Sequence, residues 1–359
     1  MALDTYSEER RIAELAVQRA SIAAKSVLRS VQTSDLIKDD ATPVTIADFA
    51  GQALMISAVR HVFPADRFIG EESADILRSD PELRDRVWDL VSSSRLEGDE
   101  GKLASPTSVD EMLDVIDLGG KEEGGPAGRF WILDPVDGTA TFMRGEQFAV
   151  SLALVKDGKE VVGVLGCPNV PPNATVIDES LVDDTGYGVM LSAVRGQGTH
   201  IRAIGPGPLL PPRPLERFSE EPIMDPTVVH FVDSSLSKSY RKDLVQKLAD
   251  TVGAKYPGTD IWSSHMRYAA LTIGGGDVQL RIPKSRRGSR ASCAWDHAGG
   301  QLIFTELGGV VRDLDGKAID FGTGRKLSNN FGMVVARPAV FELVVKLVQD
   351  VMAEDERNN

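Results

Sequence analysis

The sequence predicts a layered α/β protein whose first part is an antiparallel sheet with helices and whose second part is a smaller α/β unit. Two observations support this prediction. Helical periodicity at the start of the chain gives way to closely spaced strand-like segments, two of which are joined by the turn-forming pair Asp157-Gly158. Beyond residues 204–226, which are dense in proline and charge, strand-like and helix-like segments alternate. We therefore expect a first domain over residues 1–222 and a second over residues 223–359.

The elements of the first part follow from periodicity and from residues that end helices. Apolar residues from Ile12 to Val27 recur at helical spacing, and a second helix is expected from about Ile46 to Val62, where Pro64 ends it. Residues 92–128 are polar and rich in glycine, so they predict a loop that holds one short helix near residues 112–116. Four runs typical of strands follow: Phe130–Leu133, Phe148–Lys156, Glu160–Cys167 and Gly188–Arg195.

The second part shows the alternation of an α/β unit. Residues 204–226 are the best candidate for the segment that links it to the first part. After them, the alternating segments are residues 227–232, 240–251, 266–273, 278–282, 295–306 and 309–312. Such a unit is expected to pack against the first domain.

Composition and charge exclude several classes of protein. Of the 359 residues, 42% are hydrophobic and 26% charged, which is typical of a folded globular chain. The net charge of −13 disfavours sequence-independent nucleic-acid binding, which needs a basic surface, but does not exclude a small anionic ligand. No apolar run approaches the roughly 20 residues that span a bilayer, and the acidic N-terminal segment is unlike a signal peptide. With only Cys167 and Cys293, we expect a cytoplasmic monomer that binds neither nucleic acid nor membrane.

The most informative segment of the chain is FWILDPVDGT, residues 130–139. A predicted strand ends in Asp134, and Asp137 follows just before Gly138 and Thr139, which open a predicted helix. Two carboxylates directed at one point repel each other unless a cation lies between them, and the free N–H groups of the next two residues form an anion site. Such a pair of sites is what metal-assisted phosphoryl transfer requires. The alternative is that Asp-Pro and Asp-Gly pairs are simply turn formers.

Three further acidic residues lie at places where they can join this site. Glu71 follows a short apolar run over residues 67–69, at another predicted strand end. Asp48 lies on an otherwise apolar helix face, and Asp296 lies beside Trp295 where a helix is expected to begin. Each of them alone is more often a helix cap or a solvated charge. Together with the central motif, however, they form the set of motifs of a known family.

This set resembles the lithium-sensitive, magnesium-dependent phosphatases, which include inositol monophosphatase, fructose-1,6-bisphosphatase and the 3′(2′),5′-bisphosphate nucleotidases. The pattern of that superfamily is D, G-E-E, D-P-I/V-D-G-T and W-D, and the chain carries each element in this order. Longer stretches, among them TPVTIADFAGQ, FMRGEQFAVSLALV and WDHAGG, resemble the nucleotidase branch. The similarity runs from about Pro43 to Arg325. It implies an αβαβα sandwich, in which layers of helices and sheets alternate.

The resemblance implies which residues hold metal. Two or three Mg²⁺ ions are expected at the site. Glu71, Asp134 and the backbone carbonyl of Val136 are expected to hold one ion, and Asp134, Asp137 and Asp296 a second. Two such ions can clamp a phosphate, activate a water and stabilise the leaving oxygen.

The resemblance also assigns the catalytic and phosphate-binding groups. Thr139, hydrogen-bonded to Asp48, is expected to orient the attacking water and help to deprotonate it. The phosphate is expected to rest on the backbone N–H groups of Gly138 and Thr139. A catalytically silent metal-dependent binder is an alternative of another class, but such a binder has no need of a water-activating pair.

The substrate-binding motif departs from the family pattern at one position. Family members carry S-x-x-K-Y, whose Ser and Lys contact the substrate. In this chain Ser264, Arg267 and Tyr268 occupy the motif, with Arg in the place of Lys. This exchange keeps the charge but changes the hydrogen-bonding geometry at a phosphate. We therefore take Ser264, Arg267 and Tyr268 as candidate substrate-binding residues.

Two neighbouring stretches also differ from the family. An H-S-S-H-like stretch is replaced by SSLSK at residues 234–238, and the usual E-K-I before W-D is replaced by S-C-A at residues 292–294. The basic residues Arg286, Arg287 and Arg290 precede the second stretch. They belong either to a solvated loop or to the pocket, where Arg290 is our candidate cation for a second phosphate.

These observations predict a magnesium-dependent phosphomonoesterase. The expected reaction removes the 3′-phosphate of adenosine 3′,5′-bisphosphate to give AMP, with the 5′-phosphosulfate form as a further substrate and sulfur assimilation as the setting. An alternative is a diverged phosphatase of the same mechanism that acts on an inositol polyphosphate or another small phosphate ester.

Overall fold

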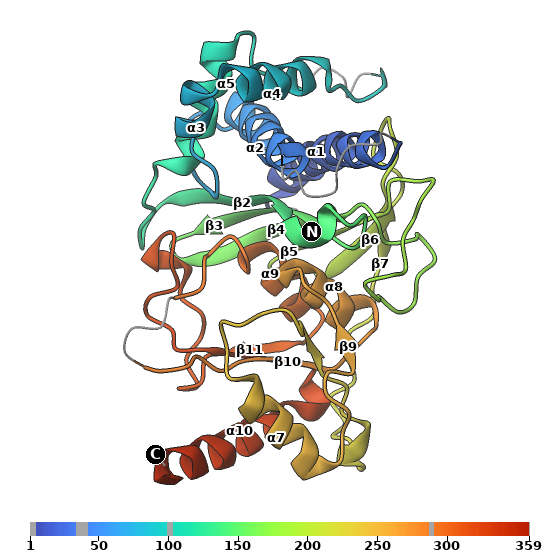
Figure 1. The fold of residues 1–359 in the computed structure, drawn as a ribbon, viewed down its shortest axis with the longest axis vertical. Coiled ribbons are helices and arrows are strands. Elements are labelled where there is room, and N and C mark those ends of the chain that lie inside the picture. The colour runs from blue at the N-terminus through green and yellow to red at the C-terminus, as the bar shows by residue number, and fades with distance from the viewer. Residues whose placement is uncertain (1–4, 34–41, 99–102, 287–290, 359) are drawn as a thin grey trace.

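The computed structural model describes residues 5–33, 42–98, 103–286 and 291–358. Figure 1 shows five layers from top to bottom: helices, a large sheet, helices, a small sheet and helices. The first layer contains α1 (Ser7–Thr33) and α2 (Thr42–Val62), the third α8 (Ser264–Ile273) and α9 (Ala298–Glu306). The αβαβα order that the sequence predicted is therefore confirmed.

The large sheet has seven strands, whose order in space is the order in the chain. The first two strands are parallel, and all later neighbours are antiparallel. The turn between the third and fourth strands is the predicted one, with positive φ at both Asp157 and Gly158. The strands are β1 (Arg67–Gly70), β2 (Arg129–Asp137), β3 (Ala149–Lys156), β4 (Lys159–Cys167), β5 (Val189–Val194), β6 (Thr199–Ala203) and β7 (Arg213–Pro214).

Helices α1 and α2 cover one face of the large sheet. Small residues of α1, such as Ala13 and Ala16, are fully buried in the same cluster as Trp131 and Leu133 of β2. Alanine in a helix brings its backbone close to the sheet, so α1 lies flat on the strands. Helix α2 ends two residues before Pro64, as predicted.

Three more helices cover the outer side of α2: α3 (Asp75–Ser79), α4 (Pro81–Ser93) and α5 (Val109–Gly120). The sequence predicted only α5. Helix α4 nevertheless carries clear signals, because Asp80 caps it by accepting from the N–H of Leu83 at 3.0 Å, and Leu83, Val87 and Val91 are buried at helical spacing.

The middle helices α8 and α9 pack between the two sheets. Two glycines at the start of α9 allow this close packing. A Cβ on Gly299 would lie 2.6 Å from Oγ of Ser151 in the sheet, and one on Gly300 would lie 2.8 Å from ring atoms of Tyr268 in α8. The sequence A-G-G is thus required at this helix start, because the large sheet lies against one side of α9 and α8 lies against the other.

The small sheet and two outer helices complete the lower layers. The small sheet is antiparallel, in the order β10 (Val278–Arg281), β12 (Met333–Ala336) and β11 (Val310–Arg312). Its outer face is covered by α7 (Lys242–Val252) and α10 (Pro338–Asn358). A parallel pair, β8 (Val232–Asp233) and β9 (Thr259–Asp260), lies beside it.

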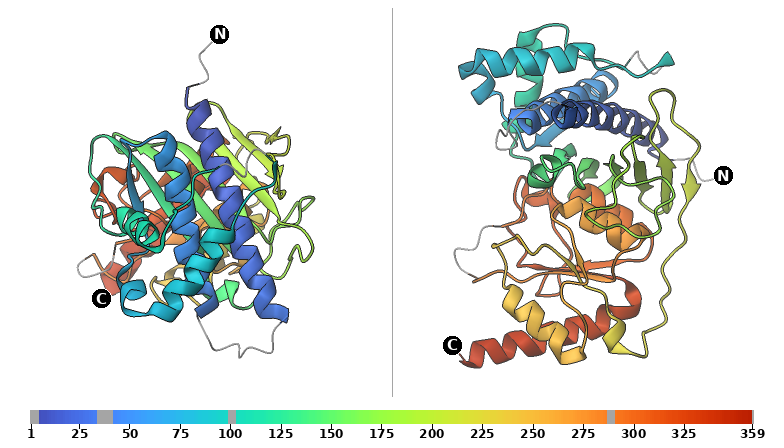
Figure 2. Two further views of the ribbon diagram at one scale, coloured as in Figure 1. Left: turned by 90° about the horizontal axis from the view of Figure 1, so that it is seen from above. Right: turned by 45° about the vertical axis from the view of Figure 1, so that its right-hand side comes forward.

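The two parts of the chain are joined by an extended segment. Figure 2 shows this segment, coloured yellow-green, descending along the side of the molecule after β7, where the sequence predicted a linker. One hydrophobic cluster contains Ile132 and Leu165 of the large sheet together with Leu302 of α9 and Val335 of β12. The domain boundary at residue 222 stays a prediction. None of the described helices is long and apolar enough to cross a membrane.

Candidate active site

The central motif forms the end of β2, where the strand interrupts its pairing with β3. Asp134 pairs with Ser151 and Asp137 pairs with Ala149, so β2 carries one residue more than β3 between these pairs. Pro135 lies in this bulge and has no N–H to give to the sheet. A Cβ on Gly51 of α2 would lie 3.0 Å from Cβ of Pro135. The close approach of α2 therefore fixes the bulge that sets the direction of the acidic side chains.

Asp134 and Asp137 are both buried, but protein donors hold only one of them. Oδ2 of Asp137 accepts from Oγ of Ser263 at 2.6 Å and from the backbone N–H of His265 at 2.5 Å. Ser263 also caps α8, because its Oγ accepts from the N–H of Met266 at 3.0 Å. Oδ1 of Asp134 has no hydrogen-bond partner within the described residues. A buried carboxylate oxygen without a donor is costly, and this atom suits a cation.

Glu71 follows β1, and two contacts fix the turn in which it lies. Gln52 of α2 accepts from the N–H of Glu72 at 3.1 Å and donates to its carbonyl oxygen at 2.7 Å. Arg325 donates from Nη2 to the carbonyl oxygen of Gly70 at 2.8 Å. Glu71 as a residue is accessible to solvent, while protein atoms largely surround its carboxyl group. The backbone is thus held while the carboxylate stays available.

Asp48 lies on α2, close to the same turn. Burial raises its pKa well above the usual range, and the nearby carboxylates of Glu72 and Glu71 raise it further, whereas the N–H of Val136 lowers it. No hydrogen bond joins the described side chains of Asp48 and Thr139. The expected link between these two residues is therefore absent from this structure, where Asp48 faces the backbone of residue 136.

Gly138 and Thr139 begin the single-turn helix α6 (Thr139–Phe142). Gly138 has a φ of 106°, and a Cβ there would lie 2.8 Å from Oγ1 of Thr141 and 3.0 Å from Cβ of Ser263. Only glycine fits this position without strain. The N–H groups of Gly138 and Thr139 have no acceptor in the part of the chain described, and the Thr139 side chain is exposed. The two N–H groups and the Thr139 side chain are therefore free to contact a ligand.

Asp296 reaches the site from the lower half of the molecule. It precedes α9, and Nε2 of the buried His265 donates to the carbonyl oxygen of Trp295 at 2.7 Å, which ties this segment to α8. Burial raises the pKa of Asp296 to about 6, and the charge of Asp137 adds to this rise. Three cations oppose it: Arg281, Lys326 and Arg267.

The carboxylates of the site act on one another electrostatically. Burial raises the pKa of Glu71 to about 7, with further contributions from Glu72 and Asp296. Burial also raises the pKa of Asp134 well above its usual range, and the charges of Glu71 and Asp137 add to it. Several acidic groups held this close favour either a bound proton or a bound cation.

The donor chemistry of the site fits Mg²⁺. Carboxylate and carbonyl oxygens are the ligands that this hard cation prefers. Among the residues that the structure describes, no group of three or more His, Cys, Asp or Glu side chains is arranged to hold an ion as it stands. These carboxylates repel one another, and a divalent cation would draw them together. The assignment of Glu71, Asp134, Val136, Asp137 and Asp296 to particular ions stays a prediction.

The predicted substrate-binding residues differ in their burial and in their contacts. Oγ of the half-buried Ser264 accepts from Nη2 of Arg281 at 2.7 Å. Arg267 is only 6% exposed, and its Nη1 donates to the carbonyl oxygens of Ile261 and Trp262, both at 3.3 Å. Its side chain therefore supports the start of α8. Arg290 lies outside the described residues.

Tyr268 does not reach the site. Its side chain is fully buried in the core between the sheets, and its hydroxyl lies 3.1 Å from Nδ1 of His297. We correct the expectation that Tyr268 contacts the substrate: it shares a helix face with Ser264, but it lies one turn further along α8, where the core between the sheets encloses it. Arg286 of the predicted basic run pairs with Asp315 at 2.7 Å on the surface.

Four residues that position the site were not identified from the sequence: Gln52, Ser263, Arg281 and Lys326. Gln52 lies within the stretch TIADFAGQ and Ser263 lies directly before Ser264, so both had a local signal. Arg281 is a single arginine on a predicted strand, and Lys326 follows the last residue of the family resemblance. Nothing local in the sequence indicates that these two cations face Asp296.

Comparisons with known proteins first define the class of fold. The Mycobacterium tuberculosis SuhB structure matches with a TM-score of 0.57 at 17% identity, covering 97% of this chain and 98% of that one. At this identity the likeness shows the fold alone, which is that of the solved inositol monophosphatases.

The sequence comparisons identify the family. Residues 8–353 match the model of the inositol monophosphatase family, and the chain belongs to this family. The 3′(2′),5′-bisphosphate nucleotidase of Emericella nidulans is 38% identical over 97% of this chain and 99% of its own length. That of Schizosaccharomyces pombe is 35% identical over 98% of each chain. The predicted resemblance is confirmed, and members of this family are generally magnesium-dependent.

Proposed function

We propose that this protein is a magnesium-dependent phosphomonoesterase that removes the 3′-phosphate of adenosine 3′,5′-bisphosphate, giving AMP and phosphate. The observation that carries the proposal is the carboxylate cluster at the end of β2, next to the free N–H groups of Gly138 and Thr139. A site for cations thus adjoins a site for an anion. The bisphosphate nucleotidases that match over nearly the whole chain support the choice of substrate.

Glu71, Asp134, the carbonyl of Val136, Asp137 and Asp296 would hold Mg²⁺. Bound there, Mg²⁺ would lower the pKa of a water and withdraw charge from the phosphate oxygens. The chain supplies the remaining functions. The N–H groups of Gly138 and Thr139 would hold the phosphate, and the exposed hydroxyl of Thr139 would orient the attacking water.

Asp48 is the candidate proton acceptor. Burial and the nearby carboxylates raise its pKa well above the usual range, which makes its carboxylate a stronger base than that of an exposed Asp. No hydrogen bond joins Asp48 to the Thr139 side chain in this structure. Proton transfer between them would require one of these side chains to move when substrate and metal bind.

The lower wall of the site is cationic and suits a ligand with a second phosphate. Arg281, Arg267 and Lys326 all act on Asp296. A substrate with one phosphate among the carboxylates would place its second anionic group within the field of these cations. This feature favours a bisphosphate over a monophosphate.

The test is phosphate release by the purified protein with Mg²⁺. We expect kcat/KM for adenosine 3′,5′-bisphosphate to exceed that for AMP, inositol 1,4-bisphosphate and fructose 1,6-bisphosphate, with loss of activity in EDTA and inhibition by Li⁺. A higher kcat/KM for an inositol or sugar bisphosphate would mean that the protein has a different substrate and the same mechanism. Binding of Mg²⁺ without turnover of any ester would indicate a silent binder. The predicted monomer and cytoplasmic location stay predictions.

A further inference from the structure

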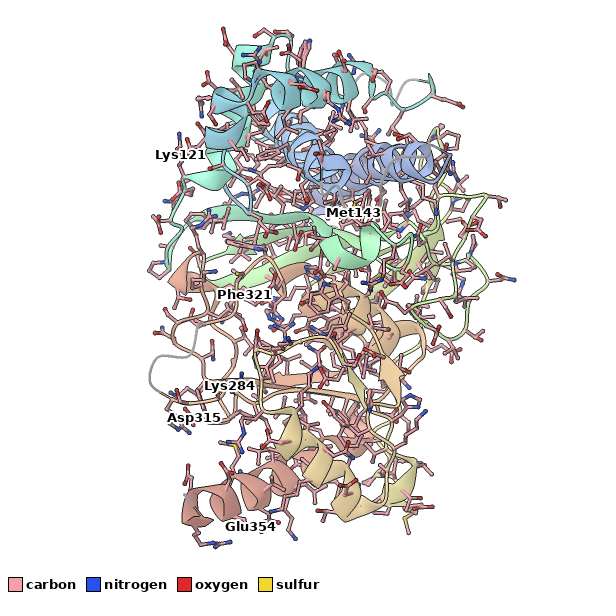
Figure 3. All side chains as sticks on the ribbon, in the orientation of Figure 1. Lys121, Met143, Lys284, Asp315, Phe321 and Glu354 are labelled. Atoms are coloured by element: carbon pink, nitrogen blue, oxygen red, sulfur yellow. The ribbon has the colours of Figure 1, made fainter. Side chains whose placement is uncertain are left out.

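Lys326 is brought to the site by a segment that follows the short 3₁₀ helix Phe321–Thr323. Phe321, labelled in Figure 3, marks where this segment lies beneath the large sheet. Lys326 and Cys293 face each other in an isolated antiparallel bridge. The bridge is flanked by two backbone hydrogen bonds of 2.9 Å, from Ala294 to Arg325 and from Leu327 to Ser292. The position of Lys326 relative to the segment that carries Asp296 is therefore fixed.

The preceding residue anchors the same segment to the turn that carries Glu71. Arg325 donates to the carbonyl oxygen of Gly70 at 2.8 Å and to that of Gly119 at 2.9 Å. Its guanidinium lies 4.8 Å from the centre of the Trp295 ring, and Nζ of Lys326 lies 5.0 Å from it. The backbone of Lys326 is thus tied at once to the turn before Glu71 and to the segment before Asp296.

Three cations interact electrostatically with Asp296, and two of them already donate hydrogen bonds to acceptors of the protein. The two Nη atoms of Arg267 donate to Ile261, Trp262 and Ser264, and those of Arg281 donate to Tyr240 and Ser264. The Nε of each arginine faces the Gln279 amide, whose oxygen accepts from both when the amide is turned to satisfy its own donors and acceptors. Both guanidinium groups are also buried. They contribute charge to the site, but they are held by the protein itself.

Lys326 differs from both arginines. Its side chain is only half-buried, and in the described residues its ammonium donates only to Sγ of Cys293, at 2.7 Å. A thiol is a weak acceptor, and an ammonium has three donors, so at least two N–H groups remain for a ligand. Burial raises the pKa of Glu71 and of Asp296, and the charge of Lys326 opposes both rises. The ammonium therefore lies near the carboxylates from both halves of the site.

We infer that Lys326 binds a phosphate oxygen of the substrate, and that Cys293 is only its resting partner. The inference rests on the proposed function and deepens it, because it names the cation of the pocket that is free to contact the ligand. It also accounts for the altered stretch at residues 292–294. Cys293 is the middle residue of that stretch, and Lys326 presents its ammonium to it across the bridge.

The experiment compares the wild-type chain with Lys326→Met, which keeps most of the side-chain length but removes the charge. Inorganic phosphate is titrated into each protein in saturating Mg²⁺ and followed by calorimetry, and KM for adenosine 3′,5′-bisphosphate is measured in parallel. Loss of a charge-assisted hydrogen bond should weaken phosphate binding by about 10- to 100-fold and raise KM by a similar factor. The Mg²⁺ concentration for half-maximal stabilisation should stay within about twofold.

Three further variants make the result specific. Lys317→Met removes an exposed lysine of the same half and should change nothing. Cys293→Ala should leave phosphate affinity unchanged, since the thiol is not part of the bound state. Lys326→Arg keeps the charge and should retain most of the affinity, and it serves as the folded comparison if the Met variant melts early.

Two outcomes would overturn the inference. Unchanged phosphate affinity in a folded Lys326→Met protein would show that the ammonium does not touch the ligand. A changed Mg²⁺ requirement with normal phosphate affinity would show that Lys326 only neutralises the carboxylates. If the wild-type chain does not hydrolyse the nucleotide at all, the proposed function fails, while the phosphate titration still reports on Lys326.

Discussion

Asp134 combines two properties that a purely structural side chain seldom has: it is 2% exposed, and one of its oxygens lacks any donor among the described residues. Its neighbour Asp137 shows the contrast, since Ser263 and His265 hold one of its oxygens. Burial raises the pKa of Asp134 well above its usual range, and a bound cation would favour its charged form. The environment of this one residue therefore argues for metal independently of any family pattern.

Replacing Asp134 by Asn should abolish turnover while the fold persists. The amide keeps the shape of the side chain but removes the charge that attracts Mg²⁺. In the wild-type protein we expect Mg²⁺ to raise the melting temperature, and in the variant we expect this rise to vanish. Thermal unfolding measures the rise in melting temperature, and phosphate release measures turnover. Asp85→Asn, on the exposed face of α4, is the control. Normal kcat in a folded variant would disprove the metal role of Asp134.

Thr139→Val tests the activation of water. The substitution removes the hydroxyl at nearly constant volume, and the side chain is exposed, so the fold should be unaffected. Loss of a positioned proton-transfer partner should lower kcat by about 100-fold or more with little change in KM. Thr139→Ser should restore most of the rate. Equal kcat values for the Val and Ser variants would show that another residue activates the water.

At the level of elements, the start of α8 links the two halves of the site. Ser263 caps this helix and donates to Asp137 with the same hydroxyl. The helix is therefore both a part of the core between the sheets and a support for a predicted metal ligand. Changes at its first residues should act on stability and on catalysis together.

Ser263→Ala should lower the free energy of unfolding by about 1 kcal/mol through loss of the cap, and it should also lower kcat. Ser108 offers a matched control, because it caps α5 by accepting from the N–H of Glu111 at 3.2 Å and lies in a different helix. Ser108→Ala should lower stability by a similar amount and leave kcat unchanged. Chemical denaturation and steady-state kinetics check both variants. An unaltered kcat in Ser263→Ala would show that the hydrogen bond to Asp137 has no catalytic role.

The elements that the sequence predicted are those whose own residues carry the pattern. Strands β3 and β4 are continuous apolar runs around a positive-φ turn, and α1 has a regular apolar face. Strand β7 is only two residues long and takes its extended form from pairing with β6, so no local pattern could reveal it. Helix α4 also carries a local pattern, in the Asp80 cap and in Leu83, Val87 and Val91 at helical spacing.

The site residues also divide into those with a local sequence pattern and those that only the fold brings together. The predicted ligands from β2 and its turn lie within a few residues, and the spacing of Asp134, Asp137 and Gly138 led to the prediction of a cation beside an anion, which stays a prediction. Arg281 and Lys326 come from a strand and a loop of the lower half, and only packing places them near Asp296. Sequence spacing can therefore suggest a site within one turn, whereas cations contributed from distant segments require the fold.

At the scale of the whole molecule, the carboxylate cluster links stability to pH and to metal. The folded protein raises the pKa of Glu71 to about 7 and that of Asp296 to about 6, so it binds more protons than the unfolded chain. By linkage, these groups stabilise the metal-free fold at low pH, and this contribution is lost as pH rises from about 4 to 7.

We therefore expect Mg²⁺ to raise the melting temperature more at pH 8 than at pH 5. Ionised carboxylates bind the cation, whereas protonated ones must first lose a proton. Melting curves at a series of pH values, with and without Mg²⁺, provide the measurement. Glu71→Gln should flatten the pH dependence of the metal-free protein, and Glu82→Gln, on the exposed start of α4, should not. A larger Mg²⁺ effect at pH 5 would contradict the linkage.

The layer of α8 and α9 between the two sheets has a consequence for synthesis on the ribosome. The large sheet is complete once Pro214 has been made, but one of its faces is covered by helices that end at Glu306. Roughly 90 further residues must be translated before that face can close, which takes about 5 to 20 s at ordinary rates. During this interval the nascent chain presents a broad apolar strand surface, so productive folding should depend on chaperones that bind it until α8 and α9 emerge.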